Sequence, residues 1–124
     1  MKVTLDNERV LCAVDDLADR SSRGFLVGEG PWPLSGFLVR KGERIHAYLN
    51  RCPHVRHRLN LKPDEFLTSD RTLIVCGSHG ALFDIESGYC TSGACLGKSL
   101  VSIPVDIVAG HVMLAEGVEP ADYE

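Results

Sequence analysis

The sequence predicts an all-β fold in which antiparallel strands from both ends of the chain form a base, with a smaller subdomain inserted between them. Short apolar or alternating runs recur along the chain and are separated by Gly, Pro and Asp, as in strands joined by turns. No segment carries the apolar stripe of an amphipathic helix, and the sequence has no internal repeat. Its 124 residues suffice for one core and a single domain.

The first part of the chain supplies strands of the base. Strands are expected at residues 10–14, 24–27, 36–40 and 45–50. The segment Lys41-Gly42-Glu43-Arg44 separates the last two and is expected to form the turn of a β-hairpin. The run Asp15-Asp16-Leu17-Ala18-Asp19 is expected to form a short turn of helix.

The rest of the chain predicts two short strands and a hairpin. Residues 73–75 and 81–84 are β-rich runs on either side of a loop. In the tail, residues 99–107 are expected to pair with 111–115 across Val108-Ala109-Gly110. The hairpin would return the chain to the base, which leaves the middle of the sequence for the inserted subdomain.

The charge and the cysteine count exclude several classes of partner and location. The formal net charge of −4, with 13 Lys and Arg against 17 Asp and Glu, argues against nucleic acid as a partner. No run approaches the ~18 apolar residues of a membrane span, and residues 1–6 do not resemble a signal segment. We therefore expect no membrane partner. The chain has five cysteines, and because an odd count fits a reducing compartment, we expect a cytoplasmic protein.

Two short segments each combine one cysteine with one histidine: Cys52-Pro53-His54 and Cys76-Gly77-Ser78-His79. An iron–sulfur cluster in which two histidines replace two cysteines on one of its irons requires this donor set. Gly80, directly after the second segment, has no side chain and would let the backbone approach a sulfide closely. The two segments, called the first and second ligand arms below, therefore predict a cluster that exchanges single electrons.

A structural zinc site is the alternative, because zinc is also held by two Cys and two His in tetrahedral geometry. Common zinc sites keep like ligands together, with a pair of cysteines followed by a pair of histidines. In this chain each arm is mixed. The mixed arms favour the two-iron cluster over zinc.

At these residues the chain resembles Rieske proteins, and specifically the small soluble bacterial Rieske ferredoxins. The resemblance implies one Rieske domain over residues 1–124, a Rieske-like fold with a cluster-binding subdomain at about 50–98, and one 2Fe-2S cluster. It implies that Cys52 and Cys76 bind one iron and that His54 and His79 bind the other. It extends from about residue 51 to residue 100, and beyond the arms it rests on Leu59-Asn60, Pro63, Phe66-Leu67, residues 79–84, Gly88, Cys90, Gly93 and Cys95.

The chain departs from the Rieske proteins of cytochrome bc complexes, which tie their two cluster loops together with a disulfide. His57 and Ser78 stand at the positions of those cysteines, so the bridge cannot form. Ala81 and Phe83 stand where those proteins place a serine and a tyrosine hydroxyl near the cluster sulfurs, and neither can donate a hydrogen bond. The resemblance therefore implies a potential near the low end of the Rieske range, about −150 mV.

The connection between the arms is longer than in most Rieske proteins, and we expect a loop extension at residues 60–70. Residues 51–62 contain Arg51, Arg56, Arg58 and Lys62 and no acidic residue. We therefore expect a cationic spot beside the cluster. Such a spot could steer an acidic patch of a redox partner toward the histidines, although solvated loop arginines are the alternative.

The remaining histidines do not predict a second metal site. His57 is expected to be an exposed loop residue, and His46 and His111 fall in strand-like runs where packing or surface roles are expected. A Rieske-type oxygenase needs a further domain with a mononuclear iron. The sequence therefore argues against an oxygenase.

The three remaining cysteines are assigned no chemistry. Cys90 and Cys95 fall in a region that forms a third loop over the cluster in similar proteins, and are expected to be small loop residues. Ala94 stands where a proline is usual, so the loop should be more mobile. A disulfide between Cys90 and Cys95 is not expected in a reducing compartment. Cys12 is expected in the core.

The leading hypothesis is an electron-transfer protein that is not itself an enzyme. The resemblance implies that it takes electrons from a flavin reductase and passes them to a terminal oxygenase. The alternative is a small Rieske-type subunit of a larger oxidoreductase, such as an assimilatory nitrite reductase. A redox sensor is a third and weaker hypothesis.

Overall fold

The computed structural model describes residues 10–27, 34–53, 58–60, 62–77, 80–93 and 95–118. These ranges contain short strands and one turn of 3-10 helix, and no helix in them is long and apolar enough to cross a membrane. The elements are β1 (Val10–Ala13), η1 (Val14–Asp16), β2 (Ser22–Val27), β3 (Leu34–Lys41), β4 (Arg44–Leu49), β5 (Leu73–Val75), β6 (Leu82–Asp84), β7 (Cys90–Ser92), β8 (Val105–Val108) and β9 (His111–Leu114).

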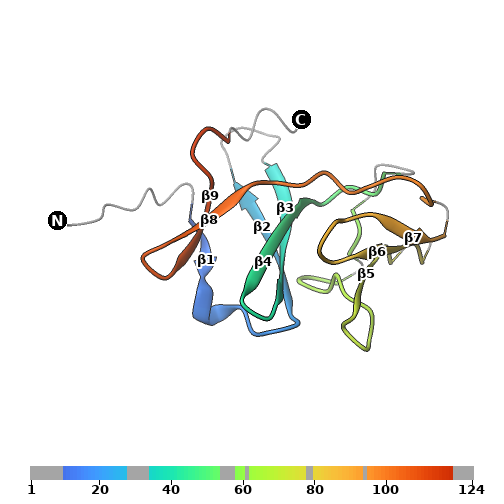
Figure 1. The fold of residues 1–124 in the computed structure, drawn as a ribbon, viewed down its shortest axis with the longest axis horizontal. Coiled ribbons are helices and arrows are strands. Elements are labelled where there is room, and N and C mark those ends of the chain that lie inside the picture. The colour runs from blue at the N-terminus through green and yellow to red at the C-terminus, as the bar shows by residue number, and fades with distance from the viewer. Residues whose placement is uncertain are drawn as a thin grey trace.

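The strands form three antiparallel sheets, in the orders β1-β9-β8, β2-β3-β4 and β5-β6-β7. Figure 1 shows the three sheets following one another along the long axis of the molecule, with β2-β3-β4 in the centre. The first and last strands of the chain share a sheet, while the third sheet is inserted between β4 and β8. These features confirm the predicted all-β fold with a base and an inserted subdomain.

The central sheet is buried on both faces, and the alternation of side chains along β3 explains how. Phe37 and its cross-strand partner Tyr48 belong to the core beneath the third sheet. The next pair, Leu38 and Ala47, belongs to the other core, beneath the β1-β9-β8 sheet. Because successive side chains of a strand point to opposite faces, one apolar run holds both parts of the molecule together.

Both predicted hairpins are present, and each has at least one residue with positive φ in its turn. β3 and β4 pair from Gly36↔Leu49 to Lys41↔Arg44, and Gly42 in the turn has a φ of +64°. In the tail, β8 pairs with β9 across Ala109 and Gly110, which both have positive φ. The short helical turn is also present, at Val14–Asp16.

The prediction that the whole of residues 99–107 pairs with the tail is wrong. Pairing begins only at Val105, because Pro104 lacks the N–H that a ladder requires. The preceding residues bridge two sheets instead: the N–H of Leu100 donates to the carbonyl of Gly88 at 2.9 Å, and the N–H of Leu49 donates to Val101 at 2.8 Å. Residues 99–103, called the strap below, thus fasten the third sheet to the edge of β4.

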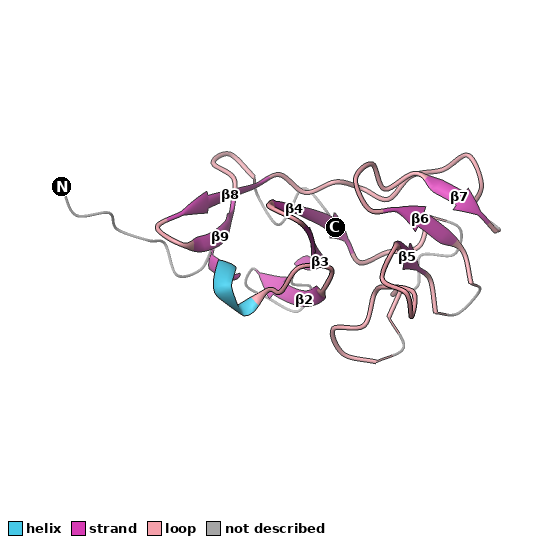
Figure 2. Cartoon of the chain, turned by 60° about the horizontal axis from the view of Figure 1, so that its bottom comes forward, coloured by secondary structure: helices cyan, strands magenta, loops and turns pink. Residues whose placement is uncertain are grey.

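The expected loop extension at residues 60–70 also packs more firmly than predicted. Phe66 is fully buried, and its ring stacks on Phe37 with the centroids 4.3 Å apart. Leu67 forms an isolated bridge with Ile74 of β5. Phe66 and Leu67 therefore contribute to the core. Figure 2 shows long loops surrounding the third sheet.

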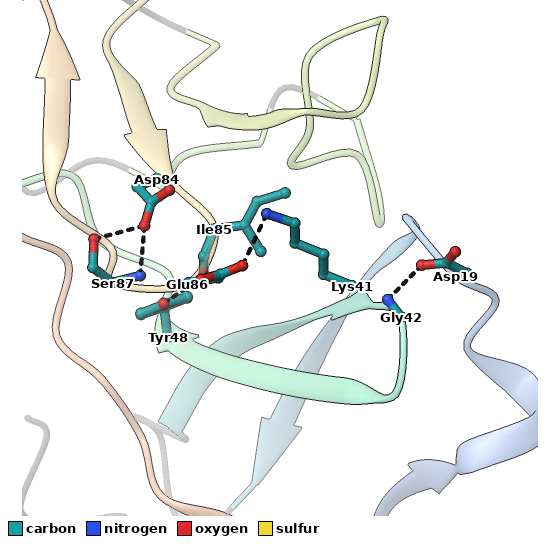
Figure 3. A network of polar contacts seen from close by, with 8 residues as sticks. All are labelled: Asp19, Lys41, Gly42, Tyr48, Asp84, Ile85, Glu86 and Ser87. Carbon is teal, nitrogen blue, oxygen red and sulfur yellow. Dashed lines mark hydrogen bonds and ion pairs between the residues drawn. The ribbon is translucent and has the colours of Figure 1, made fainter.

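A polar junction joins the β3–β4 hairpin to the turn after β6 (Figure 3). The Tyr48 hydroxyl donates to the carbonyl of Ile85 at 2.6 Å, and Lys41 Nζ lies 2.9 Å from Glu86 Oε1. Asp84 accepts hydrogen bonds from the backbone and hydroxyl of Ser87, and these bonds lower the pKa of its carboxyl. The junction fixes the angle between the base and the inserted sheet.

Candidate metal centre

The first ligand arm begins where β4 ends, and an asparagine at that point holds its shape. Asn50 Oδ1 accepts a hydrogen bond from the N–H of Leu59 at 2.8 Å, and its Nδ2 donates to Asn60 Oδ1 at 2.9 Å. These bonds hold Asn50 beside Leu59 and Asn60. Cys52, two residues after Asn50, is fully buried.

The second ligand arm follows β5, and its first residue is hydrogen-bonded to the residues that come after the arm. The N–H of Cys76 donates to the carbonyl of Ala81 at 2.9 Å, and the N–H of Gly80 donates to the carbonyl of Cys76 at 2.8 Å. Gly80 has a φ of +69°, a conformation that favours glycine, and its missing Cβ would point into open space. Cys76 is fully buried.

A backbone hydrogen bond ties the second ligand arm to a residue that follows the first arm. The N–H of Gly77, next to Cys76, donates to the carbonyl of Leu59 at 2.8 Å, and Leu59 is itself held by Asn50. Sequence reasoning missed Asn50; its only signal is a polar residue directly after a strand.

A third segment, made of Gly93 and residues 95–98, lies close to the chain around both arms. A Cβ on Gly93 would lie 2.9 Å from Cα of Ala81, so the backbone at Gly93 approaches the chain just after the second arm. The N–H of Lys98 donates to the carbonyl of Cys95 at 2.8 Å. Cys95 Sγ then lies 3.4 Å from Cys52 Sγ in the first arm.

The two further cysteines of this region have different surroundings from those expected. Cys90 was predicted to be a loop residue, and this is wrong: it begins strand β7, and its thiol donates to the carbonyl of Ser92 at 3.2 Å. Cys95 does lie in a turn, but it is fully buried. Cys12 belongs to the core beneath β1-β9-β8, as predicted, and burial raises the pKa of its thiol.

The predicted histidine ligands, His54 and His79, lie outside the described residues, as do Arg56, His57 and Ala94. Among the residues that are described, no group of three or more metal-ligating side chains is gathered. The structure thus places two of the four predicted ligands, Cys52 and Cys76, in one buried core cluster. The assignment of all four stays a prediction.

The residues present fit an iron–sulfur cluster. Two fully buried cysteines from neighbouring arms offer the thiolates that iron requires, and water is excluded from both. Ala81 and Phe83, also fully buried, line the same core and add no hydroxyl donor. Around this core the cations are on the surface: Arg58, Lys62 and Lys98 are exposed, and Arg51 is half-buried.

Two histidines outside the arms, His46 and His111, lie on strands, as predicted. His46 is half-buried on β4, and its Nε2 is a buried atom without a hydrogen-bond partner among the described residues. Burial lowers its pKa below the ordinary value of 6.5. His111 begins β9, with Nδ1 3.1 Å from the carbonyl oxygen of Ala109.

Residues 7–107 match the Rieske [2Fe-2S] domain. The chain belongs to this family. Its cofactor is accordingly one 2Fe-2S cluster, and the zinc alternative is set aside. A 2Fe-2S cluster exchanges single electrons, so the domain serves electron transfer.

Solved structures share the fold. The ferredoxin of carbazole 1,9a-dioxygenase from Nocardioides aromaticivorans IC177 is 21% identical, with a TM-score of 0.67 over 86% of this chain and 94% of that one. A ferredoxin of Sphingomonas yanoikuyae B1 is 22% identical, with a TM-score of 0.63 over 86% and 96%. The terminal oxygenase of carbazole 1,9a-dioxygenase from Novosphingobium sp. KA1 is 22% identical, with a TM-score of 0.68 over 92% of this chain but 31% of that one. No curated protein sequence matches this chain.

Proposed function

We propose that this chain is a one-electron carrier in which Cys52 and Cys76 hold one iron of the cluster and His54 and His79 hold the other. The observation that carries the proposal is the burial of Cys52 and Cys76 in one core cluster, beside the Gly77–Leu59 hydrogen bond. When bound, the cluster supplies one-electron exchange. The chain's own residues hold it, exclude water from its sulfur side and present cations around it.

We further propose that its partners are a flavin reductase as donor and a terminal oxygenase as acceptor, and that the chain delivers electrons without catalysing a reaction itself. The likeness to ferredoxins over nearly their whole length supports this assignment. A complex of reduced oxygenase and oxidized ferredoxin in carbazole 1,9a-dioxygenase also shares this fold, with a TM-score of 0.66 and 23% identity. The missing hydroxyl donors at Ala81 and Phe83 favour a low potential, about −150 mV, which a flavin donor can reach.

Cluster content tests the ligand assignment. We expect protein purified without oxygen to contain two irons and two sulfides per chain, and Cys52→Ala and Cys76→Ala to lose them, because alanine cannot bind iron. Cys12→Ala is the matched control, since Cys12 is also buried but packs in the other core. Bound zinc in place of iron, or full cluster content in either arm variant, would contradict the assignment.

Reconstitution tests the partners. The purified chain should accept electrons from a flavin reductase and support turnover by a terminal oxygenase, with no turnover when the chain is left out. Co-purification in a stable complex with a large oxidoreductase, and no transfer to an oxygenase, would instead favour a subunit of that enzyme.

A further inference from the structure

A third sulfur atom lies beside the proposed ligand sulfur of the first arm. Cys95 Sγ is 3.4 Å from Cys52 Sγ, a hydrogen-bonding distance for two sulfur atoms, and both residues are fully buried. From the separation alone, either thiol could donate. The proposed function settles the direction, because iron is bound by a thiolate, which has no proton to give.

We propose that the thiol of Cys95 donates a hydrogen bond to the Cys52 thiolate and thereby raises the reduction potential of the cluster. The inference rests on the proposed function, since it requires Cys52 as an iron ligand. It makes Cys95 a residue that sets the potential without binding iron. A thiol is a weak donor, but a charged acceptor strengthens the bond.

The loop that carries Cys95 holds this geometry. Gly93 has a φ of +99° and approaches Ala81 so closely that no side chain fits between them. Two residues later, the carbonyl of Cys95 accepts the N–H of Lys98. Lys98 in turn accepts the N–H of Cys90 at 2.8 Å, which ties the loop to strand β7. The thiol is therefore held at Cys52 by contacts on both sides of the loop.

The sign of the effect follows from charge. Reduction adds one negative charge to the cluster, so the thiolate becomes a better acceptor and the Cys95 hydrogen bond strengthens. The reduced state gains more than the oxidised state, and the potential rises. Cys95 thus partly replaces the donors that Ala81 and Phe83 cannot provide.

The midpoint potential of the holoprotein tests the proposal. In Cys95→Ala we expect the ratio of reduced to oxidised cluster at a fixed potential to fall about threefold, which is about 28 mV at 59 mV per tenfold change. Cys95→Ser should restore part of the loss, because a hydroxyl is a donor. Cys90→Ala is the matched control: this thiol is also buried but donates to Ser92, and its loss should leave the potential unchanged.

Infrared difference spectra of reduced minus oxidised wild-type protein give a second measurement, which does not depend on whether Cys95→Ala folds and binds the cluster. The S–H stretching band of Cys95 should move to lower frequency on reduction, and this feature should be absent from Cys95→Ser. An unchanged potential in Cys95→Ala, or no shift of an S–H band in wild-type protein, would overturn the proposal if the cluster is intact. If wild-type protein purified without oxygen shows no spectrum of a 2Fe-2S cluster, the proposed function itself is contradicted.

Discussion

Tyr48 joins the base to the inserted sheet through its hydroxyl. Burial, with smaller contributions from Asp84 and Glu86, raises the pKa of Tyr48 to about 12, so the hydroxyl remains a donor at physiological pH. Tyr48→Phe should lower the free energy of unfolding by about 1 to 3 kcal/mol, because the carbonyl of Ile85 loses its partner. Denaturant unfolding measures this loss. Tyr89→Phe, at an exposed tyrosine, is the control and should change little; equal losses would contradict this role.

His46 makes the same junction sensitive to pH. Burial is the main cause of its lowered pKa; Glu86 and Asp84 act against it, and Arg44 and Lys41 act with it. Between the lowered pKa and 6.5, the unfolded chain binds more protons at this residue than the folded chain. The contribution of His46 to stability is therefore complete above pH 6.5 and declines as the pH falls through this window.

His46→Gln removes this titration and should flatten the pH dependence of unfolding below about pH 6.5. Denaturant unfolding of the wild type and the variant at several pH values across the window measures how steeply the free energy of unfolding of each changes with pH. Above the window the two slopes should coincide. A variant as steep as the wild type below pH 6.5 would show that another group is responsible.

The loop of residues 93–98 offers a paired test at the scale of an element. Gly93 and Gly97 both have positive φ, but only Gly93 has no room for a Cβ, whereas Gly97 faces open space. Gly97→Ala should cost about 1 to 3 kcal/mol from backbone strain and leave the cluster spectrum unchanged. Gly93→Ala should cost more and also shift the spectrum, because the loop must move away from Ala81. Visible absorption and denaturant unfolding measure both effects, and identical behaviour of the two variants would contradict the proposed packing.

Elements fixed by neighbouring residues were predictable from the sequence, and elements fixed by distant partners were not. The β3–β4 hairpin follows from its own turn at Gly42. Strand β7 depends on distant partners: Cys90 pairs with Phe83 of β6, and Tyr89, directly before β7, bridges to Ser99 in the strap. No local sequence pattern predicts these pairings. The ligand arms were found because metal chemistry restricts residue type and spacing. The contact between Cys95 and Cys52 joins residues 43 positions apart, so sequence alone could not reveal it.

At the scale of the whole molecule, charge is distributed unevenly. The chain carries −4 overall, yet residues 51–62 hold four of its 13 cations and none of its 17 acidic residues. Exposed Arg58 lies in this stretch, four residues after the first ligand arm in the sequence. A cationic tip on an acidic protein would orient it toward an acidic partner and speed their encounter at low salt.

Arg58→Ala should therefore slow electron transfer from the reductase several-fold at low ionic strength and weaken its dependence on salt. Stopped-flow reduction at several salt concentrations measures both. Arg44→Ala is the matched control, because Arg44 is equally exposed but starts β4, about 20 Å of strand away from the first arm. Equal slowing in both variants would point to net charge rather than to a docking surface.

The electron paramagnetic resonance spectrum of the reduced protein tests the central claim most directly. Two imidazoles on one iron predict an average g-value below that of the free electron, together with couplings from two histidine nitrogens. His54→Ala and His79→Ala should each abolish this signal. A spectrum typical of a cluster held by cysteine alone, without nitrogen couplings, would contradict the assignment of these four ligands.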